Sequence, residues 1–340
     1  MNLDGLSTTV VGSFPLENTE ENFLKTIDDQ INLGIDFPCY GQLMSMIDQF
    51  LEPLAEKNVG LKKDQDKYII SNDLEVTNEP IALEYGESLL DYINKKPYLK
   101  DMIEGTKACL TGPFTLASEI ILNQEAAEGV KPRIFKEPRA IMVSRLVDKL
   151  AEIMKQIGKS YSDMGIDIIS MDEPILGLLV GGRIMFHSED FIVNTLNKAI
   201  SGIEGLSSIH VCGDISPNLR DLLLKTNVAI LDHEFQTNNR NFEIFKGEHF
   251  RGTDKYLAFG AIETKINPVK NGTIRDYIEE ISTIKGTIQK AIEIYGEENL
   301  IIKPDCGFMP LKDAFGEKMA YEITLKKLNN MILAVNQLKN

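Results

Sequence analysis

Four side chains that bind transition metals lie in three short segments of the sequence. His210 and Cys212 are two positions apart, and Glu234 and Cys306 follow further along the chain. Side chains two positions apart on a strand point to the same face, so His210 and Cys212 can bind one ion. One imidazole, two thiolates and one carboxylate match Zn²⁺ in ligand type and number. The four residues together predict a zinc site, whereas the His-x-Cys pair alone would more often be part of a packed core.

The carboxylate ligand has a competitor in the preceding residue, His233. Consecutive strand residues face opposite sides, so only one of His233 and Glu234 can point toward the ion, and the pattern does not decide which. Cys39 and Cys109 lie in apolar segments and are predicted to be packed core thiols rather than ligands.

The elements that must position these ligands alternate along the chain. Eight short apolar or β-branched segments are predicted strands, and most are followed by stretches of helical period. The predicted strands span residues 8–11, 35–39, 108–111, 166–171, 208–211, 228–231, 257–262 and 300–303, and the clearest helices span 136–161, 190–203, 274–294 and 311–338. This alternation predicts an α/β fold, a (β/α)8 TIM barrel, with a doubly wound sheet as the alternative.

One stretch interrupts the alternation. Residues 51–107 are too many for a single loop, so they are predicted to be an insertion after the second predicted strand that covers one end of the barrel. No linker or short repeat divides the chain, and residues 1–340 are predicted to be a single barrel domain. Chemistry in such barrels lies at the carboxyl ends of the strands, where the four candidate ligands are found.

The composition excludes several classes of function. The chain has 340 residues, with 36 Lys and Arg against 51 Asp and Glu, and its formal charge of -15 would repel nucleic acid and anionic lipid. No apolar run approaches the ~20 residues of a membrane span. The start of the chain lacks the pattern of a signal peptide and the four cysteines are widely spread, so we expect reduced thiols and a cytoplasmic protein. Nucleotide-binding and serine-hydrolase motifs are absent from the sequence.

The predicted ligand set favours one kind of chemistry. Two thiolates and a carboxylate around Zn²⁺ give a net charge of about -1, which makes the ion a poor activator of water. Such a site suits the binding of an external thiol as a nucleophilic thiolate, and hence thiol alkylation. Four protein ligands would close the site, so our hypothesis is that Glu234 leaves when the substrate sulfur arrives.

Two other predicted strand ends offer contacts for the rest of a thiol substrate. Asp172, in the segment M-D-E-P, can pair with an amino group, and a solvated turn carboxylate is the alternative. Gly12 and Ser13, in V-G-S-F-P, can bind a carboxylate through backbone N–H groups and the hydroxyl, and an ordinary turn is an equally good account.

These segments together resemble a known family. T-T-V-V-G-S-F-P at 8–15, M-D-E-P at 171–174, H-V-C at 210–212, Glu234 and P-D-C-G at 304–307 look like the catalytic half of cobalamin-independent methionine synthase, in its short archaeal form. The resemblance implies a (β/α)8 barrel methyltransferase whose zinc is bound by His210, Cys212, Glu234 and Cys306, which favours Glu234 over His233.

The resemblance also implies how homocysteine is bound. It assigns the homocysteine backbone to Gly12 and Ser13, to Asp172 as the candidate catalytic residue, and, on a looser alignment, to Glu79. The segments G-P-F-T-L-A at 112–117 and H-V-C-G-D at 210–214 are also similar to methylcobamide:coenzyme M methyltransferases and the uroporphyrinogen decarboxylase superfamily.

The methyl donor is suggested by a departure from the family. Its folate-using members carry a histidine after the seventh strand, where residues 263–268 here read E-T-K-I-N-P. A corrinoid leaving group needs no proton, so we expect a methylcobamide donor, free or held by a corrinoid protein, with methyltetrahydrofolate as the alternative.

Three other functions are compatible with parts of the pattern. A coenzyme M methyltransferase would bind a sulfonate without an amine, and an inward Asp172 would disfavour that ligand. A decarboxylase of the related superfamily needs arginines near the first strand, and the first 132 residues contain none. A non-catalytic barrel with structural zinc is compatible with four closed ligands.

Overall fold

The computed structural model describes residues 3, 5–70, 73–132 and 134–339. In this part of the chain the strands are Ser7–Thr8 (β1), Leu61–Asp64 (β2), Lys67–Ile70 (β3), Lys107–Thr111 (β4), Ile120–Leu122 (β5), Ile168–Asp172 (β6), Leu206–Val211 (β7), Ile230–His233 (β8), Tyr256–Ile262 (β9) and Leu300–Pro304 (β10). The α-helices are Glu20–Leu33 (α1), Asp48–Glu56 (α2), Glu84–Lys95 (α3), Pro113–Glu119 (α4), Ser144–Met164 (α5), Leu176–Leu179 (α6), Glu189–Ile200 (α7), Pro217–Leu224 (α8), Asn241–Ile244 (α9), Ile281–Tyr295 (α10), Leu311–Phe315 (α11) and Glu317–Lys339 (α12). The predicted α/β class is confirmed.

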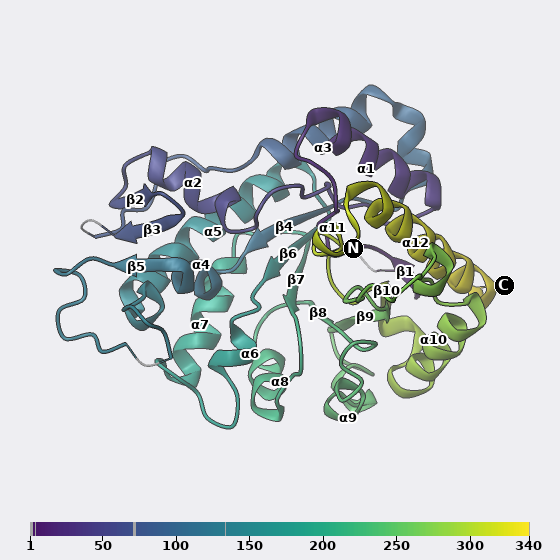
Figure 1. The fold of residues 1–340 in the computed structure, drawn as a ribbon. Coiled ribbons are helices and arrows are strands. Elements are labelled where there is room, and N and C mark those ends of the chain that lie inside the picture. Colours follow the sequence, from purple (N-terminus) through teal and green to yellow (C-terminus); the bar gives the residue numbers. More distant parts are fainter. Residues whose placement is uncertain (1–2, 4, 71–72, 133, 340) are drawn as a thin grey trace.

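A curled parallel sheet forms the centre of the molecule, with helices around it (Figure 1). Among the described residues it has seven strands in the order β1-β10-β9-β8-β7-β6-β4. The first strand therefore pairs with the last, with Ser7 beside Ile301. A doubly wound sheet would reverse its strand order at a switch point, and this sheet does not.

The predicted strand at 35–39 is wrong as a regular strand. Phe37 bridges to Thr9, after β1, and Cys39 bridges to Lys107 of β4, so this segment lies between the two outer strands of the sheet. Pro38 has no N–H group, and the Cys39 N–H donates instead to Gln30 Oε1 at 2.9 Å. Without these two donors the ladder cannot continue, and an irregular segment occupies the gap between β1 and β4.

Three helix predictions need correction. The helix predicted over 136–161 begins only at Ser144, because Leu122 N–H donates to the Pro138 carbonyl at 3.0 Å and holds that segment extended against β5. The helix predicted over 274–294 is divided into a 3₁₀ turn, Ile274–Tyr277 (η4), and α10. The helix predicted over 311–338 is divided into α11 and α12 at Gly316, which has a φ of +73°.

Residues 51–107 contain most of α2, then β2, β3, α3 and a 3₁₀ helix, Pro97–Met102 (η1). Strand β2 pairs antiparallel with β3, and β3 pairs parallel with β5, which lies outside this range. Figure 1 shows this small sheet beside α2, away from α10 and α12. That the stretch is an insertion, and that residues 1–340 form one domain, stay predictions. Among the described helices, none combines the length and apolarity needed to cross a membrane.

The interior of the curled sheet changes character along the strands. An apolar cluster fills its amino-terminal end. Burying each large apolar side chain stabilises the fold by about 1.5–3 kcal/mol. The cluster consists of Leu3, Phe37, Ile168, Ile230, Ala258 and Ile301. Inward positions recur every second residue, so Asp232 follows Ile230 and Lys303 follows Ile301. A buried charged layer therefore separates the apolar cluster from the carboxyl ends of the strands.

Candidate metal centre

Three of the four predicted ligands meet at the carboxyl ends of β7 and β10. His210 Nε2 lies 3.0 Å from Cys212 Sγ and 3.7 Å from Cys306 Sγ, and the two sulfur atoms are 3.4 Å apart. One ligand atom from each residue lies within 4.8 Å of the other two. Because β8 and β9 separate β7 from β10 in the sheet, this cluster forms across the interior rather than between neighbouring strands.

Glu234 and His233 point to opposite sides, as alternation requires. Glu234 is fully buried, and its charge contributes to raising the pKa of Cys212. The His233 ring stacks on Phe245, with ring centroids 4.9 Å apart, and its Nδ1 lies 3.2 Å from the Val211 carbonyl. Glu234 is thus the residue near the thiols, although its carboxylate is not among the three clustered ligand atoms of the described residues.

Asp232 determines the orientation of His210. Its Oδ1 lies 2.6 Å from His210 Nδ1 and 2.7 Å from the Lys303 ammonium. A neutral His210 that donates from Nδ1 to this carboxylate leaves the Nε2 lone pair directed at the two thiols. The Asp232 carboxylate therefore fixes the tautomer that a metal requires.

The charged side chains around Asp232 are almost completely buried. Lys303 and Lys107 are at most 1% exposed, and the Lys107 ammonium lies 3.8 Å from Asp232 Oδ2. Burial alone would raise the pKa of Asp232, but Lys303 and His210 outweigh it and hold this pKa well below its usual value. Burial opposes protonation of His210 as well, yet Asp232 raises the pKa of His210 to about 10. Without a metal, the fold thus favours a protonated His210 beside the thiols.

The two thiols differ in character. The hydrogen bond from Cys212 and the charge of His210 lower the pKa of Cys306, so Cys306 is held as a thiolate. The same hydrogen bond, together with burial, raises the pKa of Cys212, which keeps its proton. A metal ion bound by both sulfur atoms and by His210 must therefore displace the Cys212 proton and the Nε2 proton of His210.

Two buried polar side chains connect the loops that carry the candidate ligands. The carboxylate of Asp305, next to Cys306, accepts hydrogen bonds from two N–H groups of the loop after Glu234. The Phe235 N–H donates at 2.8 Å and the Thr237 N–H at 2.6 Å. Asn241 donates to the Glu234 carbonyl at 2.7 Å and to the Gly213 carbonyl at 3.1 Å. The backbones of the β7, β8 and β10 loops are thereby held in one arrangement.

The predicted substrate residues divide into two groups. Asp172 lies beside His210 in the β6–β7 register, and burial raises its pKa to about 7, partly offset by His210 and Lys107. Ser13 approaches the Cys306 loop so closely that a Cβ at Gly307 would lie 1.9 Å from its Oγ. Glu79 is exposed in the loop before α3, and no hydrogen bond or ion pair of the described residues joins it to the other predicted site residues.

The turn at Gly12 lies over the other two cysteines. Cys39 and Cys109 are buried with their sulfur atoms 3.5 Å apart, and the prediction of packed core thiols is confirmed. Gly12 has a φ of +141°, and a Cβ there would lie 3.0 Å from Cys109 Sγ and 3.2 Å from Cys39 Sγ. The backbone conformation at this turn therefore favours glycine, and the two sulfur atoms leave little room for a side chain.

Glu173, the neighbour of Asp172, supports the fold beside the site. Its carboxylate accepts the Phe114 N–H at 2.9 Å, the Thr115 N–H at 2.8 Å and the Thr115 hydroxyl at 2.6 Å. Burial raises the pKa of Glu173 to about 7 in spite of these hydrogen bonds. This side chain ties the start of α4 to the end of β6.

The sequence patterns did not predict five residues that contact the candidate ligands or their partners: Asp232, Lys303, Lys107, Lys265 and Asn238. A lysine inside an apolar strand, as in L-I-I-K-P at 300–304, was the available signal, because a buried lysine requires a partner. Lys265 and Asn238 carry no comparable signal, since both lie in polar loops. Their contacts with Glu234 arise only from the fold.

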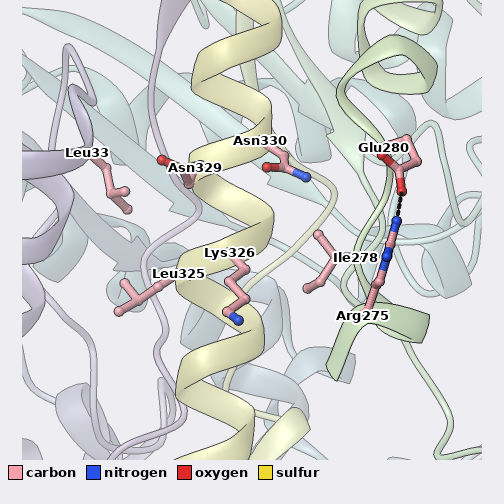
Figure 2. A pocket seen from close by; sticks show the side chains of 8 residues that line it. All are labelled: Leu33, Arg275, Ile278, Glu280, Leu325, Lys326, Asn329 and Asn330. Atoms are coloured by element: carbon pink, nitrogen blue, oxygen red, sulfur yellow. Dashed lines mark ion pairs between the residues drawn. The ribbon is translucent and has the colours of Figure 1, made fainter. Parts of the chain in front are cut away.

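A surface cavity of about 580 Å³ lies against the middle of α12. Figure 2 shows Lys326 and Asn330 on that helix, with Leu33 on one side and the ion pair of Arg275 and Glu280 on the other. No predicted site residue lines this cavity.

Comparisons with known proteins agree with these motifs. A family model described as uroporphyrinogen decarboxylase (URO-D) matches residues 101–250. The fold is similar to a B12-independent methionine synthase from Shewanella sp. W3-18-1 in complex with selenomethionine, at 18% identity and a TM-score of 0.69, covering 99% of this chain and 98% of that one. It is also similar to a methyltransferase from Methanosarcina mazei, at 13% identity and a TM-score of 0.62, covering 99% and 95%. The curled parallel sheet is therefore that of a TIM-barrel-like fold.

The sequence comparison extends over nearly the whole chain. The methionine synthase of Methanothermobacter marburgensis is 30% identical, and the match covers 97% of this chain and 99% of that protein. The methionine synthase of Methanocaldococcus jannaschii is 25% identical, with 98% and 99% covered. On this evidence the chain belongs to the methionine synthase family and is a methyltransferase.

Proposed function

We propose that the protein transfers a methyl group to the sulfur of homocysteine, which gives methionine. We propose that it uses a zinc ion bound by His210, Cys212 and Cys306, with Glu234 as a fourth ligand that leaves when the substrate sulfur binds. The proposal is carried by one observation: an imidazole nitrogen and two sulfur atoms lie within 4.8 Å of one another at the carboxyl ends of the strands. The names of the relatives support the same reaction.

The chemistry of the donor set fits zinc. The Asp232 contact at Nδ1 directs His210 Nε2 at the thiols, where it can bind an ion that displaces its proton, and one of the two thiols already favours the thiolate form. Zinc bound there supplies a soft positive centre that keeps a substrate thiol deprotonated and nucleophilic near neutral pH. The buried charges of Lys303 and Lys107 offset the negative charge that thiolates bring to this interior.

Asp172 and the Gly12–Ser13 turn are the proposed contacts for the homocysteine backbone. Asp172 is buried next to His210, where its carboxylate can pair with an ammonium group of the substrate. Ser13 lies against Gly307, one residue from Cys306, which puts a hydroxyl within reach of a substrate carboxylate. Glu79 stays a prediction based on the family resemblance, because its exposed position provides no independent support.

For the methyl donor, we propose a methylcobamide, free or carried by a corrinoid protein. Lys265 lies in the loop where a proton donor would be needed for a folate leaving group. Burial would lower the pKa of Lys265, but the ion pair with Glu234 raises it overall, which makes this ammonium a weak acid. A donor whose leaving group needs no proton suits such a loop.

The test is anaerobic demethylation of methylcobalamin by zinc-loaded protein, followed by absorbance, with homocysteine or coenzyme M as acceptor. We expect turnover with homocysteine only, and loss of both zinc and turnover in Cys212→Ser. Turnover with methyltetrahydrofolate and none with methylcobalamin would contradict the proposed donor. Stoichiometric zinc without binding of either thiol would contradict the proposed reaction and favour a structural metal.

A further inference from the structure

The carboxylate of Glu234 is held by two side chains outside the cluster of thiols. The Lys265 ammonium lies 2.9 Å from Oε1 and 3.3 Å from Oε2, and the Asn238 amide donates to Oε2. Glu234 is fully buried, whereas the Lys265 side chain is 52% exposed. A buried carboxylate that is neutralised by a half-exposed lysine has a partner that can withdraw into solvent.

The backbone of Glu234 cannot carry the carboxylate to a new position. Asn241 binds its carbonyl at 2.7 Å, and Asp305 binds the next N–H group, that of Phe235, at 2.8 Å. Any movement of the carboxylate must therefore come from rotation of its own side chain about a fixed Cα. Two partners lie within its surroundings. One is the Lys265–Asn238 pair, and the other is the cluster of thiols, because Asn241 joins the Glu234 carbonyl to the carbonyl of Gly213, the neighbour of Cys212.

These two partners compete for the carboxylate. Lys265 contacts both carboxylate oxygens, and no oxygen of Glu234 is among the clustered ligand atoms of the described residues, so the side chain must rotate away from its present contacts to bind an ion at His210, Cys212 and Cys306. When the carboxylate stays with Lys265, the three clustered side chains alone would hold the ion, and a fourth position is left for an external ligand. The balance between the two arrangements thus controls access to the centre.

We propose that Lys265 and Asn238 form a holding site for the Glu234 side chain, which keeps the carboxylate off the metal and leaves room for the substrate thiol. This inference rests on the proposed function of the centre. Lys265 acts through Glu234 and is a positioning residue. A thiol that binds only the open arrangement is favoured by every contact that stabilises Glu234 on the holding site.

The holding site has a quantitative consequence. Replacing Lys265 by methionine removes the charge-assisted hydrogen bonds to Glu234, so the carboxylate moves toward the ion. We expect homocysteine to bind the zinc-loaded Lys265→Met protein about tenfold more weakly. Zinc itself should bind this variant more tightly, by up to a similar factor, because it gains the carboxylate as a ligand.

Two equilibrium measurements test this. Zinc affinity is measured by competition with a chromophoric chelator, and homocysteine binding to the zinc-loaded protein by calorimetry, neither of which requires turnover. Lys270→Met is the matched control, because Lys270 is exposed in the same loop and its loss changes the net charge equally. We expect the control to leave both affinities within twofold of wild type.

A double variant separates the holding site from a general charge effect. In a Glu234→Ala background, Lys265→Met should change neither affinity, because the residue through which Lys265 acts is gone. Equal effects with and without Glu234, or no effect of Lys265→Met on either affinity, would overturn the inference. Wild-type protein that binds no zinc would refute the proposed function instead, so the two failures are distinguishable.

Discussion

Replacing Asp232 by asparagine tests the buried charges that orient His210. Asp232 Oδ1 lies 2.6 Å from His210 Nδ1 and 2.7 Å from the Lys303 ammonium, so it contacts both groups. Asparagine keeps the shape and one acceptor oxygen but leaves two buried lysines without their counter-charge. Breaking a buried ion pair in this way costs about 3–5 kcal/mol of folding free energy. Loss of the carboxylate that orients a metal-binding histidine costs about 10–100-fold in metal affinity.

Two measurements keep these effects apart. Urea unfolding of the metal-free protein reports the folding free energy, and competition with a chromophoric chelator reports the zinc affinity. Asp214→Asn is the matched control, because Asp214 is exposed two residues after Cys212 and its loss changes the charge equally. We expect the control to be close to wild type in both measurements.

The double variant Asp232→Asn, Lys303→Met decides what Asp232 does. Removing Lys303 as well takes away one unpaired buried charge, so part of the folding free energy should return. The zinc affinity should stay low, because the carboxylate that fixes the His210 tautomer is still missing. Wild-type zinc affinity in Asp232→Asn, or its full recovery in the double variant, would refute the assignment of Asp232 to His210.

Three further predictions follow from the surrounding contacts. Asp172→Asn should raise the KM for homocysteine about tenfold or more, with a smaller change in kcat, because a charged contact to the substrate ammonium is lost. The methylcobalamin assay measures both constants, and an unchanged KM would contradict this role. The pKa of Glu173 is about 7 in the folded state, above its usual 4.5, so its contribution to stability is complete below pH 4.5 and is lost as the pH rises through 7. The free energy of unfolding of wild type relative to Glu173→Gln should therefore fall by on the order of 2–3 kcal/mol between pH 4.5 and 8 in urea titrations, and a flat difference would refute the raised pKa. Gly307→Ala should destabilise the protein by about 1–3 kcal/mol, because the added methyl group would meet the Ser13 hydroxyl. Gly286→Ala, at an open position of α10, should stabilise the protein slightly. Equal shifts in melting temperature for the two variants would contradict the contact with Ser13.

Local patterns determined much of the fold. The alternation of apolar runs and amphipathic stretches predicted the α/β class and the approximate position of seven of the eight parallel segments, because inward burial and helical period are properties of neighbouring residues. Residues 35–39 do not form the predicted regular strand, in part because the Gln30 side chain forms hydrogen bonds with both the N–H and the carbonyl of Cys39. No local pattern reveals that contact. Helix starts were displaced for the same kind of reason, as at Pro138.

The candidate site shows the same division. Spacing alone put His210 and Cys212 on one face, and strand-end motifs brought Cys306 into the prediction although 94 positions separate it from Cys212. The pattern left His233 and Glu234 open, and the packing of His233 on Phe245 determined which of them faces the thiols.

Only the tertiary structure decided the electrostatics. A lysine in a sequence is expected at the surface, yet Lys303 is fully buried because Asp232, on another strand, supplies its counter-charge. The contact of Lys265 with Glu234 likewise joins two loops that are distant in the sequence. Residue types and their local period can be read along the chain, whereas the partner of a buried charge depends on which strands the closing sheet brings together. For that reason the candidate ligands could be proposed from the sequence, and the charged groups around them could not.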